Sequence, residues 1–160
     1  MLNRRFLCLA AVVVSLAGCA TSPTPLTLAD QLAQTPSLST LHGLVLKAGL
    51  NDTLKGPGPF TVFAPNNEAF KAVPAKTMDE LAKDPARLQA VLKYHLLPAQ
   101  LTAANVKNGP AKTLEGANLT LARTGAFITV EEAMVVTADI QATNGTVHIL
   151  DRVLVPPVRK

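Results

Sequence analysis

Residues 60–70 of this chain have the sequence Phe60-Thr61-Val62-Phe63-Ala64-Pro65-Asn66-Asn67-Glu68-Ala69-Phe70. The first four residues are aromatic or β-branched, which predicts a short strand over 60–63. The Pro-Asn-Asn triplet that follows predicts the start of a short helix that runs through Phe70. The segment therefore joins a strand directly to a helix. The patterns around it are mainly helical, and those after residue 114 are mainly of strands.

Helical patterns occur on both sides of this segment, from residue 27 to residue 95. Thr27 and Asp30 suit a helix start in which the threonine caps the first turn. A second helix is predicted from its apolar spacing, with Gly49 at its C-terminus. Asp84 and Pro85 form a good N-cap and first-turn pair for a later helix. The residues on the buried faces are Leu41, Leu44, Val45 and Ala48 in the second helix and Leu88, Val91, Leu92 and His95 in the later one.

The last third of the chain is patterned as strands joined by short turns. Its β-branched and apolar residues predict strands over 119–121, 127–130, 134–140 and 147–155. The pair Asn144-Gly145 precedes the last strand, and we expect it to supply positive φ angles in a tight turn. Helices first and antiparallel strands later indicate the α+β class rather than a parallel array of strand–helix–strand units.

The first 18 residues have the pattern of a secretory signal peptide. Two arginines at positions 4 and 5 form a basic end, an apolar run covers residues 6–17, and small residues precede Cys19. This run is shorter than the roughly 20 residues that a membrane-spanning helix needs. The sequence Leu16-Ala17-Gly18-Cys19 resembles the lipoprotein box of bacteria. That resemblance implies that Cys19 becomes the first mature residue and carries the acyl chains that hold the protein on a membrane.

The sequence thus predicts four parts. They are a lipoprotein signal peptide (1–18), the lipidated cysteine with a short tether (19–26), one domain (27–157) and a tail (158–160). Removal of the signal lowers the net charge from +4 to +2, and the remaining basic residues are scattered, so no clustered face for nucleic acid is expected. The two cysteines, Cys8 and Cys19, lie outside the predicted domain. We therefore expect no disulfide and no cysteine nucleophile in it.

Three segments of the chain together resemble the fasciclin-like domain family. They are residues 60–70, the motif Leu92-Lys93-Tyr94-His95-Leu96-Leu97, and the segment Asn144-Gly145-Thr146-Val147-His148-Ile149-Leu150-Asp151-Arg152-Val153-Leu154-Val155-Pro156. The resemblance extends over roughly residues 26–157. It implies a fold of helices packed on two β-sheets that meet as a wedge. It also implies a role in adhesion at cell surfaces, because fasciclin-like domains occur in extracellular and cell-surface proteins and have no enzymatic chemistry in common.

Tyr94 and His95 are the candidate partner-binding residues, because the tyrosine–histidine motif of some family members is tied to binding. His95 falls on the apolar face of its predicted helix, which favours a structural role in joining the helix to a strand or loop, with partner binding as the alternative. Tyr94 points to a different side, so it is the better candidate of the two for an exposed contact, but packing is the favoured role for it as well. His148 is expected to be half-buried on its strand. The residues expected to be structural are Thr61, Pro65, Asn144, Gly145, His148 and Asp151.

The sequence gives little support for catalysis or metal binding. His42, His95 and His148 are too far apart in the chain to form a local metal-binding motif. The serines of the mature chain lie in the tether or near the first helices, and none occurs in a Gly-x-Ser-x-Gly turn. We therefore expect neither a metal nor a cofactor. An enzyme would require a deep pocket that holds a histidine and a carboxylate.

The sequence predicts a lipid-anchored binding or adhesion module of the bacterial cell envelope, with an unknown protein or glycan partner and no catalysis. The alternative is a periplasmic accessory protein that binds an envelope protein or a small ligand. The short tether favours this alternative, because an adhesin would need a longer reach. Ala20 follows Cys19, where an aspartate commonly retains Gram-negative lipoproteins in the inner membrane. The outer membrane is therefore the expected location, and the domain is expected on either its periplasmic or its outer face.

Overall fold

The computed structural model describes residues 26–156, so the predicted signal peptide, Cys19 and the predicted tail lie outside the described residues. The helices are α1 (Leu28–Gln34), α2 (Ser39–Lys47), α3 (Asn51–Lys55), α4 (Asn67–Lys71), α5 (Ala75–Lys83) and α6 (Pro85–Tyr94), with 3-10 turns η1 (Pro36–Leu38) and η2 (Ala103–Asn105). The strands are β1 (Phe60–Pro65), β2 (Leu96–Leu97), β3 (Gly109–Lys112), β4 (Asn118–Thr124), β5 (Phe127–Val130), β6 (Ala133–Ala142) and β7 (Gly145–Leu150).

The helix ends follow the local signals of the sequence. Thr27 caps α1 through a reciprocal pair of hydrogen bonds with Asp30, as predicted. The hydrogen bonds from Thr27 also hold the pKa of the Asp30 carboxyl below its usual value. Asp84 caps α6 by accepting hydrogen bonds from two backbone N–H groups of its first turn. Gly49 follows the end of α2 with a φ of 69°, which an L-residue with a side chain rarely adopts.

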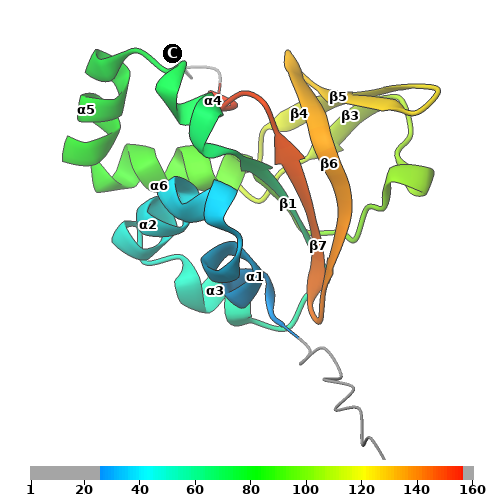
Figure 1. The fold of residues 1–160 in the computed structure, drawn as a ribbon, viewed down its shortest axis with the longest axis horizontal. Coiled ribbons are helices and arrows are strands. Elements are labelled where there is room, and N and C mark those ends of the chain that lie inside the picture. The colour runs from blue at the N-terminus through cyan, green and yellow to red at the C-terminus, as the bar shows by residue number, and fades with distance from the viewer. Residues whose placement is uncertain (1–25, 157–160) are drawn as a thin grey trace, which may run out of the picture.

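The seven strands form one sheet in the order β2-β1-β7-β6-β5-β4-β3. Strand β6 belongs to both halves, because Ala133 and Met134 pair with β5 whereas residues from Val135 onward pair with β7. Register shifts interrupt the pairing of β6 with β7 between Val135 and Ile140, and such irregularities bend a strand. The strands of the two halves therefore run in clearly different directions (Figure 1). The predicted wedge of two sheets is confirmed, and its two sheets share β6.

The pairing of the central strands differs from the prediction. β1 and β7 are parallel, from Phe60 beside Gly145 to Pro65 beside Leu150, whereas the sequence predicted an antiparallel set of strands. Long helical and strand segments separate β1 from β7 in the chain, so no hairpin imposes an antiparallel partner. β7 can therefore lie beside β1 in the same direction, and the sheet contains both parallel and antiparallel pairs of strands.

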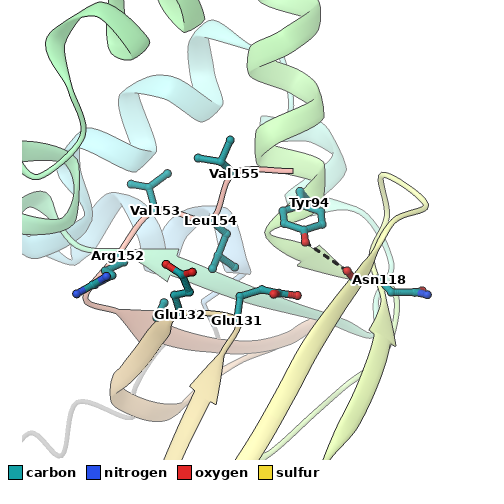
Figure 2. Close-up of a pocket in the computed structure, with 9 residues that line it drawn as sticks. Tyr94, Asn118, Glu131, Glu132, Arg152, Val153, Leu154 and Val155 are labelled. Atoms are coloured by element: carbon teal, nitrogen blue, oxygen red, sulfur yellow. Dashed lines mark hydrogen bonds between the residues drawn. The ribbon is translucent and has the colours of Figure 1, made fainter. Parts of the chain in front are cut away.

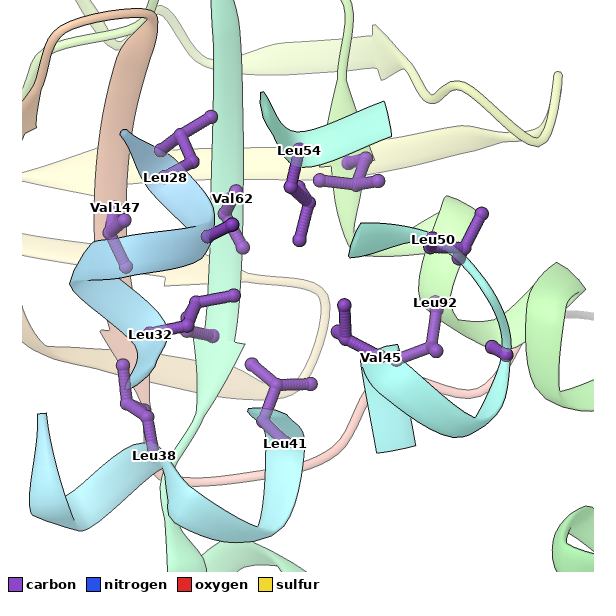
Figure 3. Packing of buried hydrophobic residues seen from close by; sticks show 14 of the residues in the cluster. Leu28, Leu32, Leu38, Leu41, Val45, Leu50, Leu54, Val62, Leu92 and Val147 are labelled. Carbon is purple, nitrogen blue, oxygen red and sulfur yellow. The ribbon is translucent and has the colours of Figure 1, made fainter. Parts of the chain in front are cut away.

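The central strands are buried on both faces and separate two hydrophobic cores. Alternate residues of β1 point to opposite sides, so Val62 and Phe63 belong to different cores. The helical core lies between the helices and one face of β1 and β7, and it includes Leu28, Leu32, Leu38, Leu41, Val45, Leu50, Leu54, Val62, Leu92 and Val147 (Figure 3). The sheet core lies inside the wedge and is formed by Phe63, Tyr94, Leu97, Val106, Leu119, Leu121, Ile128, Val130, Ala133, Leu150 and Leu154.

The edges of the sheet are short and protected. β2 has two residues, and the carbonyl of Leu96 accepts a hydrogen bond from the backbone N–H of Leu114 at 2.7 Å. β3 at the other edge contains Pro110, which has no N–H to offer to another strand, and the exposed Lys112.

The side chain of Asn144 connects three parts of the fold at the turn between β6 and β7. Its Oδ1 accepts a hydrogen bond from the N–H of Leu28, the first residue of α1, at 2.9 Å. Its Nδ2 donates to the carbonyl of Leu54 in α3 at 2.7 Å and to that of Gly56 at 2.9 Å. The backbone carbonyl of Asn144 also accepts from the N–H of Phe60 at 3.1 Å, at the start of β1. One residue thus joins α1, α3, β1 and β7.

The expected reason for glycine at position 145 is wrong. Neither Asn144 nor Gly145 has a positive φ. The carbonyl oxygen of Phe60 instead approaches the Cα of Gly145 so closely that a Cβ at this position would overlap it. A second glycine, Gly58, faces the carbonyl of Asn144 in the same way. The pair Asn144-Gly145 therefore serves the close approach of backbones rather than the turn conformation.

We predict that Asn144→Ala lowers the free energy of unfolding by roughly 2–4 kcal/mol, because three backbone groups lose their partner in a partly buried site. Urea denaturation monitored by circular dichroism measures the difference. The matched control is Asn105→Ala on the exposed turn η2, which should change the value by less than about 0.5 kcal/mol. Equal effects of the two substitutions would contradict the role assigned to Asn144.

Candidate functional site

A cleft of about 460 Å³ lies at the end of the molecule where β7 finishes. Four segments meet there: the last turn of α6, the start of β4, the turn between β5 and β6, and the chain that follows β7 (Figure 2). The lining residues are Tyr94, Asn118, Glu131, Glu132, Ala133, Arg152, Val153, Leu154 and Val155. The cleft thus combines an aromatic residue, charged groups and an apolar wall.

Tyr94 lies at this cleft and is packed, which is the role that the sequence favours over an exposed contact. Its side chain belongs to the sheet core, and only 3% of the residue is exposed. Its hydroxyl donates a hydrogen bond to the backbone carbonyl of Asn118 at 3.3 Å. Asn118 at the start of β4 and Leu154 after β7 lie beside Tyr94 on this side of α6. Burial, followed by the charges of Glu131 and Glu115, raises the pKa of Tyr94, so the phenol keeps its proton.

His95 lies behind the cleft wall rather than on the surface. It is the C-cap residue of α6 and is 2% exposed. Its Nδ1 donates to the carbonyl of Val91 at 2.8 Å, and its Nε2 accepts from the backbone N–H of Leu154 at 3.0 Å. Its own carbonyl accepts from the N–H of Phe63 in β1 at 2.9 Å. His95 therefore ties α6 to β1 and to the segment that forms the cleft wall.

This hydrogen-bond pattern assigns the proton of the neutral His95 ring to Nδ1. A second proton on Nε2 would displace the N–H of Leu154, because two donors would then face each other. Burial lowers the pKa of His95 from 6.5 to about 4, although the hydrogen bond to Val91 opposes this shift. The ring is therefore neutral at physiological pH and acts as a fixed support for the wall.

The last strand ends earlier than predicted, and the chain that follows it forms the cleft wall. The sequence predicted a strand over 147–155, whereas β7 ends at Leu150. Asp151 stops it: its Oδ1 accepts from the N–H of Met134 at 2.7 Å, and its own N–H donates to the carbonyl of Met134 at 3.1 Å. This pair turns the chain away from the sheet, and Arg152 to Val155 pass over the sheet core instead of extending β7.

The charged side of the cleft comes from the turn between β5 and β6. Glu131 has a φ of 54°, which is rare for a residue with a side chain. It accepts a hydrogen bond from the N–H of Thr120 at 2.6 Å and returns one to the carbonyl of Thr120 at 2.8 Å. The neighbouring Glu132 and the facing Arg152 are exposed. Sequence reasoning missed both glutamates, since two acidic residues between strands are typical of an ordinary solvated turn.

His148 and Thr61 are buried in another part of the fold and do not reach the cleft. His148 is 1% exposed, not half-buried as predicted, because loop residues 99–104 cover this side of β7. Its Nε2 donates to the carbonyl of Leu101 at 2.8 Å, and its Nδ1 accepts from the N–H of Asp139 at 3.3 Å. Its ring stacks on Phe63 with 5.6 Å between ring centroids.

Thr61 holds the same loop from the neighbouring strand. Its hydroxyl donates to the carbonyl of Ala99 at 2.6 Å and accepts from the N–H of Leu101 at 2.8 Å. Pro65 closes β1 beside Leu150 and is buried. The hydroxyl of Thr61 thus satisfies backbone groups of an irregular segment that would otherwise lack partners.

Within residues 26–156, no three side chains of histidine, cysteine, aspartate or glutamate gather closely enough to hold a metal ion. His42 is half-exposed on α2, whereas His95 and His148 use both ring nitrogens for backbone hydrogen bonds. No helix in this part of the chain is long and apolar enough to cross a bilayer.

We predict that His95→Gln lowers the free energy of unfolding at pH 7.5 by roughly 1–3 kcal/mol, because Val91 and Leu154 lose a well-placed partner. Wild-type stability should also fall as the pH drops from 6.5 to about 4. In this window the unfolded chain binds a proton at His95 that the folded chain does not, so the loss reaches on the order of 3 kcal/mol. Chemical denaturation across this pH range measures both effects.

The variant lacks the titrating ring, so its stability should approach that of the wild type as the pH falls. Parallel curves for the two proteins would contradict the buried, neutral state of His95. His42→Gln is the matched control at pH 7.5, and it should change the free energy of unfolding by less than about 0.5 kcal/mol because its ring makes no hydrogen bond among the described residues.

Comparison with known proteins agrees with this architecture. The chain is 38% identical over 141 residues to Protein sll1483 of Synechocystis, which covers 87% of this chain and 78% of that protein. It is 37% identical over 151 residues to the cell surface glycolipoprotein MPB83 of Mycobacterium bovis, covering 91% of this chain and 66% of the relative.

A similar solved structure is that of a FAS1 domain pair from the insect cell adhesion molecule Fasciclin I. Its TM-score is 0.60 at 24% sequence identity, and the match covers 74% of this chain and 45% of that one. This likeness concerns the fold. The model of the fasciclin domain matches residues 36–156, which include every strand and the whole cleft. The chain therefore belongs to the fasciclin domain family.

Proposed function

We propose that this protein is a lipid-anchored binding module of the bacterial cell envelope, without catalytic activity, that recognises a protein or glycan partner. The observation that carries the proposal is the sequence Leu16-Ala17-Gly18-Cys19, which precedes a fasciclin domain matched over residues 36–156. A relative that aligns with 91% of this chain is named as a cell surface glycolipoprotein, which supports the same kind of anchoring here. The acyl chains on Cys19 would hold the domain on the membrane.

The cleft beside Tyr94 is the proposed recognition surface. Its wall is held by His95 and Asp151, and its opposite side by the hydrogen bonds of Glu131, so a partner would not have to order it. Preformed surfaces lose little conformational entropy on binding. Val155 offers apolar area to a partner, because it is 57% exposed. Exposed charges of both signs surround it and would align polar groups of the partner.

The proposed location is the outer membrane, because Ala20 rather than aspartate follows Cys19. The domain would then face either the periplasm or the outside. The short tether favours a second candidate function, a periplasmic accessory role with an envelope protein or small ligand as partner, since an adhesin needs a longer reach than the six residues between Cys19 and Leu26 allow.

We predict that Cys19→Ser abolishes membrane attachment, because acyl transfer to the protein requires the thiol. The wild-type protein should sediment with membranes, and mass spectrometry should find acyl chains on Cys19. The variant should be recovered without them, and its fold should be unchanged because Cys19 precedes the first residue of the fasciclin match. Equal recovery of both forms in the membrane fraction, without acyl mass, would contradict lipid anchoring.

Protease treatment of intact cells then separates the two candidate functions. Removal of the domain from intact cells would show that it faces outward and would support adhesion. Protection until the outer membrane is opened would exclude direct contact with other cells and support the periplasmic role.

We also predict that Glu132→Lys weakens binding of the soluble Cys19→Ser form to isolated envelopes of the source bacterium by at least about tenfold, which is about 1.4 kcal/mol. The substitution reverses one exposed charge on the rim of the cleft. Asp79→Lys makes the same charge change on α5, outside the cleft, and is the matched control. A co-sedimentation isotherm gives the affinities. Equal affinities of the two variants would exclude the cleft as the recognition surface.

A further inference from the structure

The chain enters the domain at the turn between β6 and β7. The carbonyl of Leu26 accepts hydrogen bonds from the N–H of Thr143 at 2.8 Å and from its hydroxyl at 3.3 Å. Thr27 then caps α1, whose first N–H is held by Asn144. From Leu26 onward the chain is therefore part of the rigid fold, and only the residues before it separate the domain from Cys19.

Six residues, 20–25, lie between Cys19 and Leu26. Covalent geometry therefore keeps the Cα atoms of Cys19 and Leu26 within about 24 Å of each other. A domain anchored at Cys19 therefore keeps Leu26 close to the bilayer surface.

The cleft lies at the other end of the molecule. β7 begins at Gly145, directly after the turn that holds Leu26, and runs to Leu150. Six residues of strand span roughly 17 Å, and the cleft wall starts only after them. Figure 1 shows the same arrangement, with the described chain beginning at one extremity and ending near the opposite one. The cleft and the point at which the chain enters the domain therefore lie at opposite ends of the molecule.

We propose that the short tether orients the anchored domain, with the β6–β7 turn and α3 toward the bilayer and the cleft on the side away from it. The cleft then meets a partner that is not embedded in the same bilayer, such as a soluble macromolecule or a polymer of a facing layer. Partners that diffuse within the same membrane would instead reach the sides of the domain. This inference rests on the lipid anchor proposed above, and it adds the direction in which the domain binds.

Two single-cysteine variants of the full acylated chain test the orientation. The folded domain has no cysteine of its own, so an introduced thiol is labelled selectively. Lys55→Cys is exposed at the end of α3, next to Leu54, which Asn144 binds. Glu132→Cys is exposed at the cleft and is the matched site at the other end. Each protein, with a fluorophore on the new thiol, is placed in phosphatidylethanolamine–phosphatidylglycerol vesicles that carry a nitroxide quencher on the lipid headgroup.

We expect the label at residue 55 to be quenched about twofold or more strongly than the label at residue 132, because quenching requires proximity to the headgroups. A flexible Gly-Ser insertion of about 20 residues between Pro25 and Leu26 should remove the difference, since its average reach exceeds the length of β7. Equal quenching of the two labels with the natural tether, on protein whose Cys19 is acylated by mass, would overturn the orientation alone. Absence of acyl chains on Cys19 would overturn the anchor and the orientation together.

Discussion

The parallel pair of β1 and β7 has no solvent-facing side, and this constraint explains the polar residues of the fold. A polar group on these strands is costly unless it finds a partner inside the protein. Thr61 and His148 do so by binding backbone groups of the loop around Leu101. The hydroxyl of Thr146 has no partner among the described residues, at a cost of about 1–3 kcal/mol. The residues that resemble a functional motif in the sequence are therefore largely the ones that make two-sided burial possible.

His95 is a buried polar residue that connects β1 to the wall of the cleft. Its ring lies between α6 and the chain after β7, and its two nitrogens bind backbone groups from both. Tyr94 and His95 are adjacent in sequence but differ in role, because the first lines the cleft and the second supports its wall. The two residues of this motif are thus both buried, and they stabilise different segments around the cleft.

Local signals in the sequence were sufficient for much of the fold. The cap at Thr27, the N-cap at Asp84 and the glycine after α2 lie where short-range chemistry predicted them. The sequence could not reveal that β7 pairs with β1 in parallel, because no pattern within either strand records the direction of a distant neighbour. It also could not reveal the cleft. The early end of β7 depends on the carboxylate of Asp151, which meets Met134 only after the sheet has formed. For the same reason, Gly145 looked like a turn residue, although its lack of a side chain serves the close approach of Phe60.

The protected edges of the sheet matter most where many copies of the domain are crowded together. A strand with free N–H and C=O groups invites a strand from a neighbouring molecule, and the rate of such contacts rises with local concentration. Here one edge strand has two residues, with the carbonyl of Leu96 already bound, and the other contains proline and an exposed lysine. These edges therefore leave neighbouring copies few backbone groups with which to extend the sheet from one molecule to the next.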